Sequence, residues 1–187
     1  MKTIYLQLFL FVLFCSLLSS CISNKKRIVS EITSLYGRTI DFPAILDCVT
    51  QDSVIYCAQI DSLVDFSRTT IVTYLDSSNC KKCALTILEY WHNVLLNNDI
   101  FDKTNFIVVV HSTNPNILRT IYKELDLPYK LFVDQLDTFM LINEISDCLE
   151  QNRTFLIDAE RKVHLVGTPL RNKSLIELYK KEIEASM

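Results

Sequence analysis

The chain has 187 residues, a formal net charge of −3 and a hydrophobic content of 49%, which suit one domain with a real core and a short extension. Its charges are mixed, without a long basic or acidic block, and this excludes a nucleic-acid partner. With only 2 glycines and 4 prolines, the composition also excludes collagen-like repeats, disordered linkers and glycine-rich phosphate loops.

Residues 1–20 have the pattern of an export signal peptide. Lys2 supplies a short positive end, residues 4–18 are almost wholly apolar, and Leu18-Ser19-Ser20-Cys21 follows. This ending resembles the lipobox of bacterial lipoproteins, in which an aliphatic and two small residues precede a cysteine. The resemblance implies cleavage before Cys21, which would then carry diacylglycerol and an N-acyl chain such as palmitate. An uncleaved signal anchor is the alternative, although the apolar run is short for a membrane span.

Residues 21–27 are predicted to form a tether that keeps Lys25, Lys26 and Arg27 close to the lipid surface. The residues directly after Cys21, Ile22-Ser23-Asn24, contain no acidic retention or surface-export signal. We therefore expect a lipid-anchored protein of the bacterial cell envelope that faces the periplasm, with the membrane as its partner through Cys21.

Residues 28–66 are predicted to be an N-terminal extension with one helix and short strands. Ile28, Ile32 and Leu35 have helical spacing, and short apolar pieces at 54–56 and 63–64 predict one or two strands. Cys48 and Cys57 lie in this extension, and in an exported chain they are candidates for a structural disulfide. Two free thiols, or a pairing of either one with Cys148, are the alternatives.

Residues 67–187 are predicted to be the main domain, with alternating strands and helices that give a mixed sheet covered on both faces. The first strand, 70–75, is followed by a helix over 80–96 whose apolar residues recur at helical spacing. The other predicted elements are a strand over 105–110, a helix over 116–125, a strand over 130–133, strands over 154–157 and 163–166, and a helix over 174–185.

The tetrapeptide Cys80-Lys81-Lys82-Cys83 lies between the strand over 70–75 and the helix that follows it. Two thiols three positions apart at the first turn of a helix can close a small disulfide. Unpaired backbone N–H groups, the positive end of the helix dipole and the two lysines all favour the thiolate of Cys80. The motif therefore predicts a redox centre. An inert structural disulfide is the alternative, and no Cys–His grouping completes a zinc site.

The order of these elements around the CxxC pair resembles the thioredoxin fold. The nearer resemblance is to TlpA/ResA-like thiol–disulfide oxidoreductases and redoxin-domain lipoproteins, over residues 65–185. Three segments carry it: the strand over 71–75 with Cys80 and Cys83, the run 127–134, and the strand 154–158. The resemblance implies an α/β thioredoxin-like sheet flanked by helices on both faces. It also implies disulfide exchange with exported proteins and an upstream redox partner, without a cofactor or metal.

The sequence departs from this family at three positions. The proline that usually forms a cis bond before the strand over 154–158 is replaced by Asn152, where we expect a trans peptide. The buried acid or amide six residues before the first cysteine is replaced by Tyr74, and the aromatic residue before that cysteine by Asn79. Besides Lys81 and Lys82, His111 is a candidate to tune the site, because its strand ends at the sheet edge where Cys80 is expected.

These residues predict a membrane-anchored, extracytoplasmic thiol–disulfide oxidoreductase that acts through Cys80 and Cys83. The alternative is a non-catalytic thioredoxin-like lipoprotein that binds a partner. The direction of electron transfer and the identity of the substrate do not follow from these residues.

Overall fold

The computed structural model describes residues 24–76, 81–98 and 103–186, except for the side chains of residues 81–85. The chain divides into two compact units, residues 1–34 and residues 35–187. In the first, residues 24–34 are helical, and Arg27 and Glu31, one turn apart, form an ion pair at 2.8 Å. No helix within the described residues is both long and apolar enough to cross a membrane. Residues 1–20, predicted to be a signal peptide, and Cys21 lie outside the described residues, so cleavage and lipidation stay predictions.

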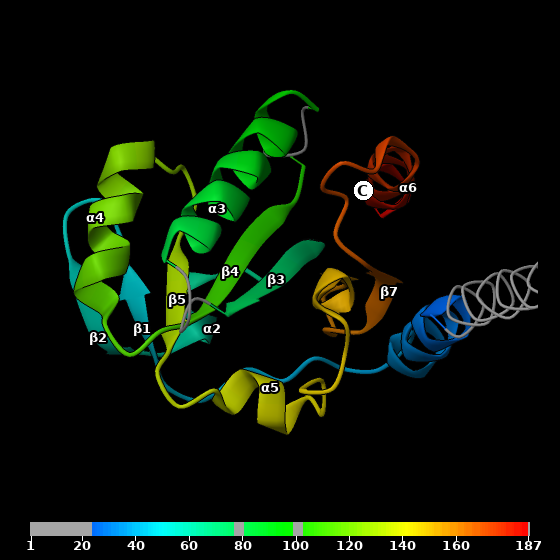
Figure 1. The fold of residues 1–187 in the computed structure, drawn as a ribbon, viewed down its shortest axis with the longest axis horizontal. Coiled ribbons are helices and arrows are strands. Elements are labelled where there is room, and N and C mark those ends of the chain that lie inside the picture. The colour runs from blue at the N-terminus through cyan, green and yellow to red at the C-terminus, as the bar shows by residue number, and fades with distance from the viewer. Residues whose placement is uncertain (1–23, 77–80, 99–102, 187) are drawn as a thin grey trace, which may run out of the picture. The chain divides into compact units, whose positions relative to one another are not determined.

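The second unit is built on one seven-stranded sheet with the order β2-β1-β5-β4-β3-β6-β7 (Figure 1). Strands β3, β4 and β5 run parallel, whereas β1, β2, β6 and β7 pair with their neighbours antiparallel. The strands are β1 (Leu46–Val49), β2 (Val54–Ala58), β3 (Thr70–Asp76), β4 (Asn105–His111), β5 (Leu131–Asp134), β6 (Thr154–Ile157) and β7 (Val163–Val166).

Helices connect the parallel strands, as parallel pairing requires. β3 leads into α3 and then β4, and β4 leads through α4 into β5, so that both crossovers join neighbouring strands. The helices of this unit are α2 (Ile60–Leu63), α3 (Lys81–Leu96), α4 (Pro115–Leu125), α5 (Thr138–Ile142) and α6 (Lys173–Ala185), with a 3₁₀ helix over Glu150–Asn152.

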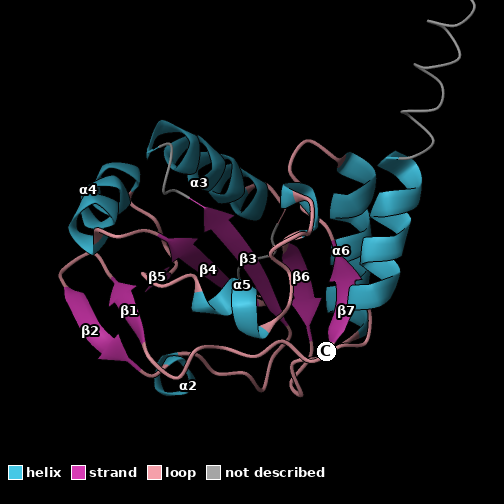
Figure 2. Ribbon diagram, turned by 60° about the horizontal axis from the view of Figure 1, so that its bottom comes forward, coloured by secondary structure: helices cyan, strands magenta, loops and turns pink. Residues whose placement is uncertain are grey.

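Both faces of the sheet are covered. Leu75 of β3 belongs to the buried cluster that contains α3, α4 and α6 residues, whereas the ring of the preceding residue, Tyr74, stacks on Phe139 of α5. Because successive strand residues point to opposite faces, α3, α4 and α6 cover one face and α5 the other (Figure 2). The predicted α/β architecture, a mixed sheet with helices on both faces, is confirmed.

Aromatic packing fixes α3 on its face of the sheet. Trp91 of α3 is 1% exposed, and its ring lies 4.7 Å from that of Phe106 on β4. Phe106 in turn meets Tyr129 edge-on, and the Tyr129 hydroxyl donates to the Leu88 carbonyl of α3 at 3.1 Å. These contacts hold the helix that begins directly after Cys80, so core packing and the candidate site are linked.

Two short helices differ from the sequence prediction. Of the piece at 63–64, expected to be extended, Leu63 is instead the last residue of α2, whose only fully buried residue is Ile60, while Val64 is its extended C-cap. α5 was not predicted at all; it has five residues, of which Phe139 and Met140 are buried. Neither helix is long enough to show an apolar repeat at helical spacing.

The stability of the fold is sensitive to alkaline pH because of four buried or partly buried tyrosines: Tyr74, Tyr122, Tyr129 and Tyr179. Burial is the main cause that raises the pKa of each phenol above 10. The folded chain therefore keeps these protons while the unfolded chain releases them near pH 10. The contribution of these phenols to the free energy of unfolding is therefore complete below about pH 10 and is lost as the pH rises further.

We expect the urea midpoint of unfolding, followed by the fluorescence of Trp91, to fall steadily between pH 9.5 and pH 11. Tyr129→Phe removes one of these protons, so its midpoint should fall less steeply over the same interval, even though the variant is less stable at neutral pH. A midpoint that is flat across this interval in the unchanged chain would contradict the argument.

Candidate redox site

The last three residues of the CxxC segment lie at the start of α3. α3 begins at Lys81, so Lys81, Lys82 and Cys83 occupy its first turn, while Cys80 immediately precedes it and lies outside the described residues. The first backbone N–H groups of a helix have no partner within the helix and favour negative charge. Lys81, Lys82 and Cys83 thus lie at the start of the helix that was predicted to follow β3, whereas a redox pair with Cys80, its ionisation and the roles of Lys81 and Lys82 stay predictions.

Three titratable residues align at the edge of the sheet where the parallel strands end. Asp76 of β3 is in register with His111 of β4, and His111 is in register with Asp134 of β5. His111 is half-buried, and its Nδ1 lies 2.9 Å from the Asp134 carbonyl oxygen. Cys80 follows Asp76 by four residues. The predicted position of His111 at this edge is confirmed, and its effect on the thiols stays a prediction.

Tyr74 is held in a pair that the sequence did not indicate. Its hydroxyl donates a short hydrogen bond to the Asp137 carboxylate, and the Arg153 guanidinium lies 6.0 Å from the centre of its ring. Burial, followed by this hydrogen bond and the charge of Asp137, raises the pKa of Tyr74. The phenol is therefore a fixed proton donor at neutral pH. Asp137 lies in the turn before α5, 63 residues away, and no local pattern marks it.

Asn152 ends a 3₁₀ helix at the position where a cis-proline was expected from the resemblance, and its side chain is 2% exposed. No peptide bond between described residues is cis. The loop is fixed by its backbone: the Thr168 N–H donates to the Gln151 carbonyl at 2.7 Å, and the Gly167 N–H to the Thr154 carbonyl at 2.8 Å. Gly167 has a φ of +119°, a conformation that side-chain-bearing residues rarely adopt.

A cavity of about 410 Å³ separates this loop from α3. β3, which leads to Cys80, forms one wall, and α3, which begins after Cys80, forms another. The residues that line it are Thr73, Tyr74, Leu75, Ile87, Trp91, Leu149, Glu150, Gln151, Thr154, Thr168 and Leu170. Its two principal walls are therefore the elements on either side of the CxxC segment.

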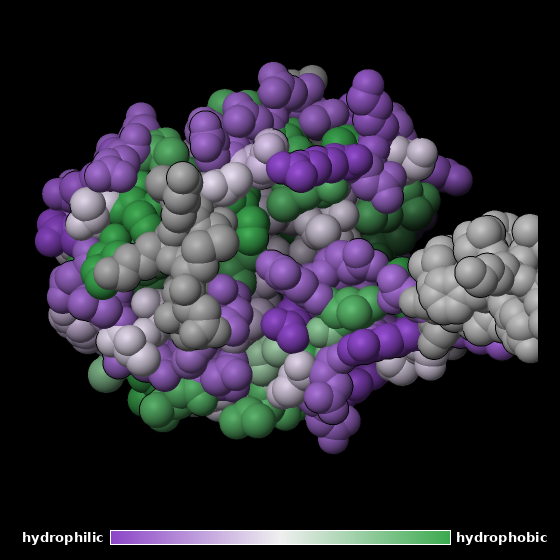
Figure 3. Space-filling view, in the orientation of Figure 1, coloured by the Kyte–Doolittle hydropathy of each residue, from purple (hydrophilic) through white to green (hydrophobic). Residues whose placement is uncertain are grey.

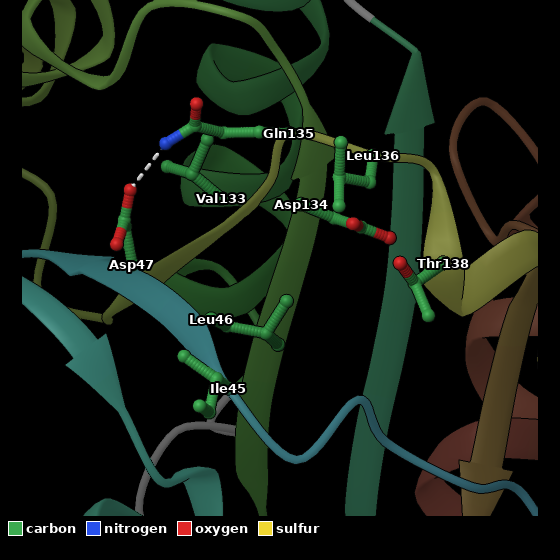
Figure 4. A pocket seen from close by; sticks show the side chains of 8 residues that line it. All are labelled: Ile45, Leu46, Asp47, Val133, Asp134, Gln135, Leu136 and Thr138. Carbon is green, nitrogen blue, oxygen red and sulfur yellow. Dashed lines mark hydrogen bonds between the residues drawn. The ribbon is translucent and has the colours of Figure 1, made fainter.

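A second cavity, of about 290 Å³, opens between β1 and the end of β5 (Figure 4). Its two acidic side chains already accept hydrogen bonds. Asp47 binds the Gln135 amide at 2.6 Å and the Cys57 N–H at 3.1 Å, and Asp134 accepts from the Phe139 N–H at 2.6 Å. These carboxylates fix the turn before α5, and a structural role accounts for them.

Of the alternatives left open for Cys48 and Cys57, the structure has two free thiols and not the candidate disulfide between them. Cys48 is buried, and burial raises its pKa. Cys57 is exposed, because the register of β2 shifts beside it and its backbone has a φ of +54°. Within the described residues, no group of three Cys, His, Asp or Glu side chains is arranged to hold a metal ion.

No family in a comparison with known protein families matches this sequence, and no curated protein matches it either. Solved structures do match. The thioredoxin domain of a thiol-disulfide oxidoreductase from Bacteroides vulgatus has a TM-score of 0.54 at 17% identity, covering 79% of this chain and 97% of that domain. A thiol:disulfide interchange protein from Bacteroides sp. has a TM-score of 0.53 at 16% identity, covering 80% and 90%.

A thioredoxin-like protein from Porphyromonas gingivalis matches with a TM-score of 0.52 at 18% identity, covering 79% of this chain and 93% of that one. These likenesses extend over nearly the whole length of each of the three solved chains. The chain therefore has a thioredoxin-like fold, as its sequence predicts.

Proposed function

We propose that this protein is a thiol–disulfide oxidoreductase that acts through Cys80 and Cys83. The observation that carries the proposal is that the CxxC sequence follows β3 and runs into the first turn of α3 in a thioredoxin-like sheet. The solved structures that share this fold include a thiol-disulfide oxidoreductase domain and a thiol:disulfide interchange protein, which supports the same chemistry.

In this proposal the Cys80 thiolate attacks one sulfur of a partner disulfide. A mixed disulfide forms, and the second partner sulfur leaves as a thiolate that takes up a proton. Cys83 then attacks the Cys80 sulfur, the partner leaves as a dithiol, and Cys80 and Cys83 become the disulfide. The partner gains two electrons and the CxxC pair loses them; the reverse sequence oxidises a dithiol partner. An upstream dithiol donor or disulfide acceptor returns the pair to its starting state.

The cellular setting is part of the proposal. Residues 1–20 would be removed as a signal peptide, and Cys21 would be acylated, so that the domain is held at the membrane by the tether. The support is the sequence Leu18-Ser19-Ser20-Cys21 after an apolar run. Proteins with stable disulfides are found in oxidising compartments such as the periplasm. The partners are then the thiols and disulfides of exported proteins.

Reduction of insulin by dithiothreitol, followed as turbidity, tests the proposed activity. We expect the full chain in detergent micelles to shorten the lag before precipitation, and Cys80→Ser to return it to the uncatalysed value. Cys148→Ser is the matched control and should keep the activity, because Cys148 lies on the loop between α5 and β6 and not in the CxxC segment. Equal activity in the unchanged chain and in Cys80→Ser would overturn the proposal.

Exposed apolar residues favour a non-catalytic binding module as the second candidate. Leu136, Leu141 and Ile142 are 81%, 64% and 41% exposed, and hydrophobic residues show on the surface over α5 (Figure 3). Surface apolar residues in a group are a feature of protein-binding faces. An inactive insulin assay combined with capture of a partner that Leu141→Asp prevents would favour this alternative.

A further inference from the structure

An apolar strip of exposed residues borders the cavity between β1 and the end of β5. Ile45, directly before β1, and Leu136, in the turn after β5, both line this cavity of about 290 Å³ and are exposed (Figure 4). Leu141 and Ile142 of α5 are also exposed, and they follow Thr138, another lining residue, by three and four positions. Residues with this spacing lie on one side of a helix. Ile45, Leu136, Leu141 and Ile142 therefore form one surface, which we call the α5 strip.

The two carboxylates that line this cavity are bonded to neutral donors alone. Asp47 accepts from the Gln135 amide and the Cys57 N–H, and Asp134 accepts from the Phe139 N–H. The ion pairs between described residues include neither carboxylate. A carboxylate that is removed from water without a counter-ion destabilises a fold. The two negative charges are therefore available to a cation that approaches the cavity from outside.

The segments that build this face of the protein are acidic. Residues 39–67 and 131–152 contain ten of the 22 acidic residues of the chain and none of its 19 lysines and arginines. Arg38 and Arg153, which border the face from neighbouring segments, are already engaged. Arg38 pairs with Glu144 at 3.4 Å, and Arg153 donates to two backbone carbonyls of the loop before β6, both at 3.1 Å. The face therefore favours cationic partners over acidic polypeptides and over the surface of an anionic membrane.

The turn that carries Leu136 is fixed before any partner binds. The Gln135 amide donates to Asp47 at 2.6 Å on one side of Leu136, and on the other side the Tyr74 hydroxyl donates to Asp137. A face whose shape is set in advance avoids the entropy cost of ordering it on binding. The cavity of about 290 Å³ is slightly smaller than the sites of about 300–1,000 Å³ that hold small molecules, so it suits one side chain and not a whole cofactor.

We propose that the α5 strip and its cavity bind a polypeptide segment in which a lysine or arginine is adjacent to a large aliphatic residue. The aliphatic side chain packs between Ile45 and Leu136, and the basic side chain lies at the rim of the cavity near Asp47 and Asp134. Polypeptides that carry an acidic residue at the same place are rejected by charge repulsion. This interaction needs no thiol, so it goes beyond the proposed disulfide exchange and gives the exposed apolar residues a partner of defined chemistry.

Methyl NMR of the full chain in phosphatidylcholine nanodiscs follows binding at the strip itself. The probe is the tripeptide acetyl-leucyl-arginyl-leucinamide. The methyl signals of the α5 strip should shift and saturate at millimolar concentration, since the probe is small and makes few contacts. Leu96 on α3 and Leu178 on α6 are exposed leucines outside the strip, and their signals should stay in place. Acetyl-leucyl-glutamyl-leucinamide, which differs only in the sign of its charge, should bind about tenfold more weakly.

Two pairs of variants separate the apolar from the charged contribution. Leu136→Ser should weaken binding of the arginine peptide about fivefold, whereas Leu96→Ser, the same change on α3, should leave it unchanged. Asp47→Asn should weaken it about threefold, whereas Asp52→Asn removes an equal charge from the exposed turn between β1 and β2 and should have no effect. Equal affinities for the arginine and glutamate peptides, or for Leu136→Ser and Leu96→Ser, would overturn the proposal.

This proposal and the redox function fail separately. A Cys80→Ser, Cys83→Ser double variant should bind the arginine peptide with the affinity of the unchanged chain, because neither thiol belongs to the α5 strip. Binding of the arginine peptide without insulin reduction would support the strip as a docking site and overturn the redox function alone. Insulin reduction without any shift of the strip signals would overturn the docking site alone.

Discussion

A chain carrying Cys83→Ser is expected to accumulate as a covalent adduct with insulin, linked through Cys80. Cys80 opens an insulin disulfide and bonds to one of its sulfurs, while the other sulfur leaves as a thiol. Normally Cys83 then attacks Cys80 and releases insulin. Without Cys83 no thiol follows in the first turn of α3 to complete the exchange. Intact-mass spectrometry under nonreducing conditions should show most of the chain as adduct, and dithiothreitol should return it to the free form.

Cys80→Ser is the matched variant for this experiment and should give no adduct, because Cys83 lies one turn further into α3. Cys57 serves as an internal comparison: it is an exposed free thiol outside the CxxC segment. Peptide mapping should locate the insulin link at Cys80 alone. A link at Cys57, or similar adduct yields for Cys80→Ser and Cys83→Ser, would show that ordinary exposure and not the position of Cys80 determines the reactivity.

Trp91→Ala is expected to lower the free energy of unfolding by about 3–5 kcal/mol. The side chain is 1% exposed and packs on Phe106 at 4.7 Å between ring centres. Truncation to alanine removes its buried area and leaves a space that joins the neighbouring cavity of about 410 Å³, so relaxation of the surroundings cannot refill it. The loss is a large share of the 5–15 kcal/mol that holds a typical domain together.

Urea unfolding followed by far-UV circular dichroism measures this change, since the variant has no tryptophan. Leu96→Ala is the matched control: it lies on the same helix but is 55% exposed, and we expect a change of at most about 0.5 kcal/mol. If Trp91→Ala unfolded at the same urea concentration as Leu96→Ala, the aromatic packing of α3 on β4 described above would not be what holds this helix.

The parts of the fold that the sequence predicted are those with a long, regular pattern. β3 and β4 are continuous apolar runs, and α3, α4 and α6 have apolar residues at helical spacing, so their existence and order were recognisable. The short α2 and α5 were not, since four or five residues contain no complete repeat. Their positions depend on contacts between distant residues. In α5, for example, Phe139 stacks on the ring of Tyr74, and this contact is visible only in three dimensions.

The candidate site likewise has some features that the sequence predicts and others that it does not. The CxxC segment and the position of His111 follow from local sequence and from the geometry of parallel strands. The pairing of Tyr74 with Asp137, and the meeting of Trp91 with Thr168 in one cavity, join residues from distant segments, and no local rule connects them. The choice between a disulfide and two free thiols at Cys48 and Cys57 also depends on geometry that local sequence does not give, because a shift in strand register beside Cys57 leaves it exposed while Cys48 is buried.

Both outer strands of the sheet depart from a flat, free edge. On one side, the irregular register of β2 at Cys57 bends the free edge. On the other, residues 37–40 pair with the first residue of β7 and the turn before it, and the Gly37 N–H donates to the Val163 carbonyl at 2.8 Å. Free, flat edges are the usual template for edge-to-edge aggregation. These two departures shorten the flat edge with which a second copy of this domain could pair.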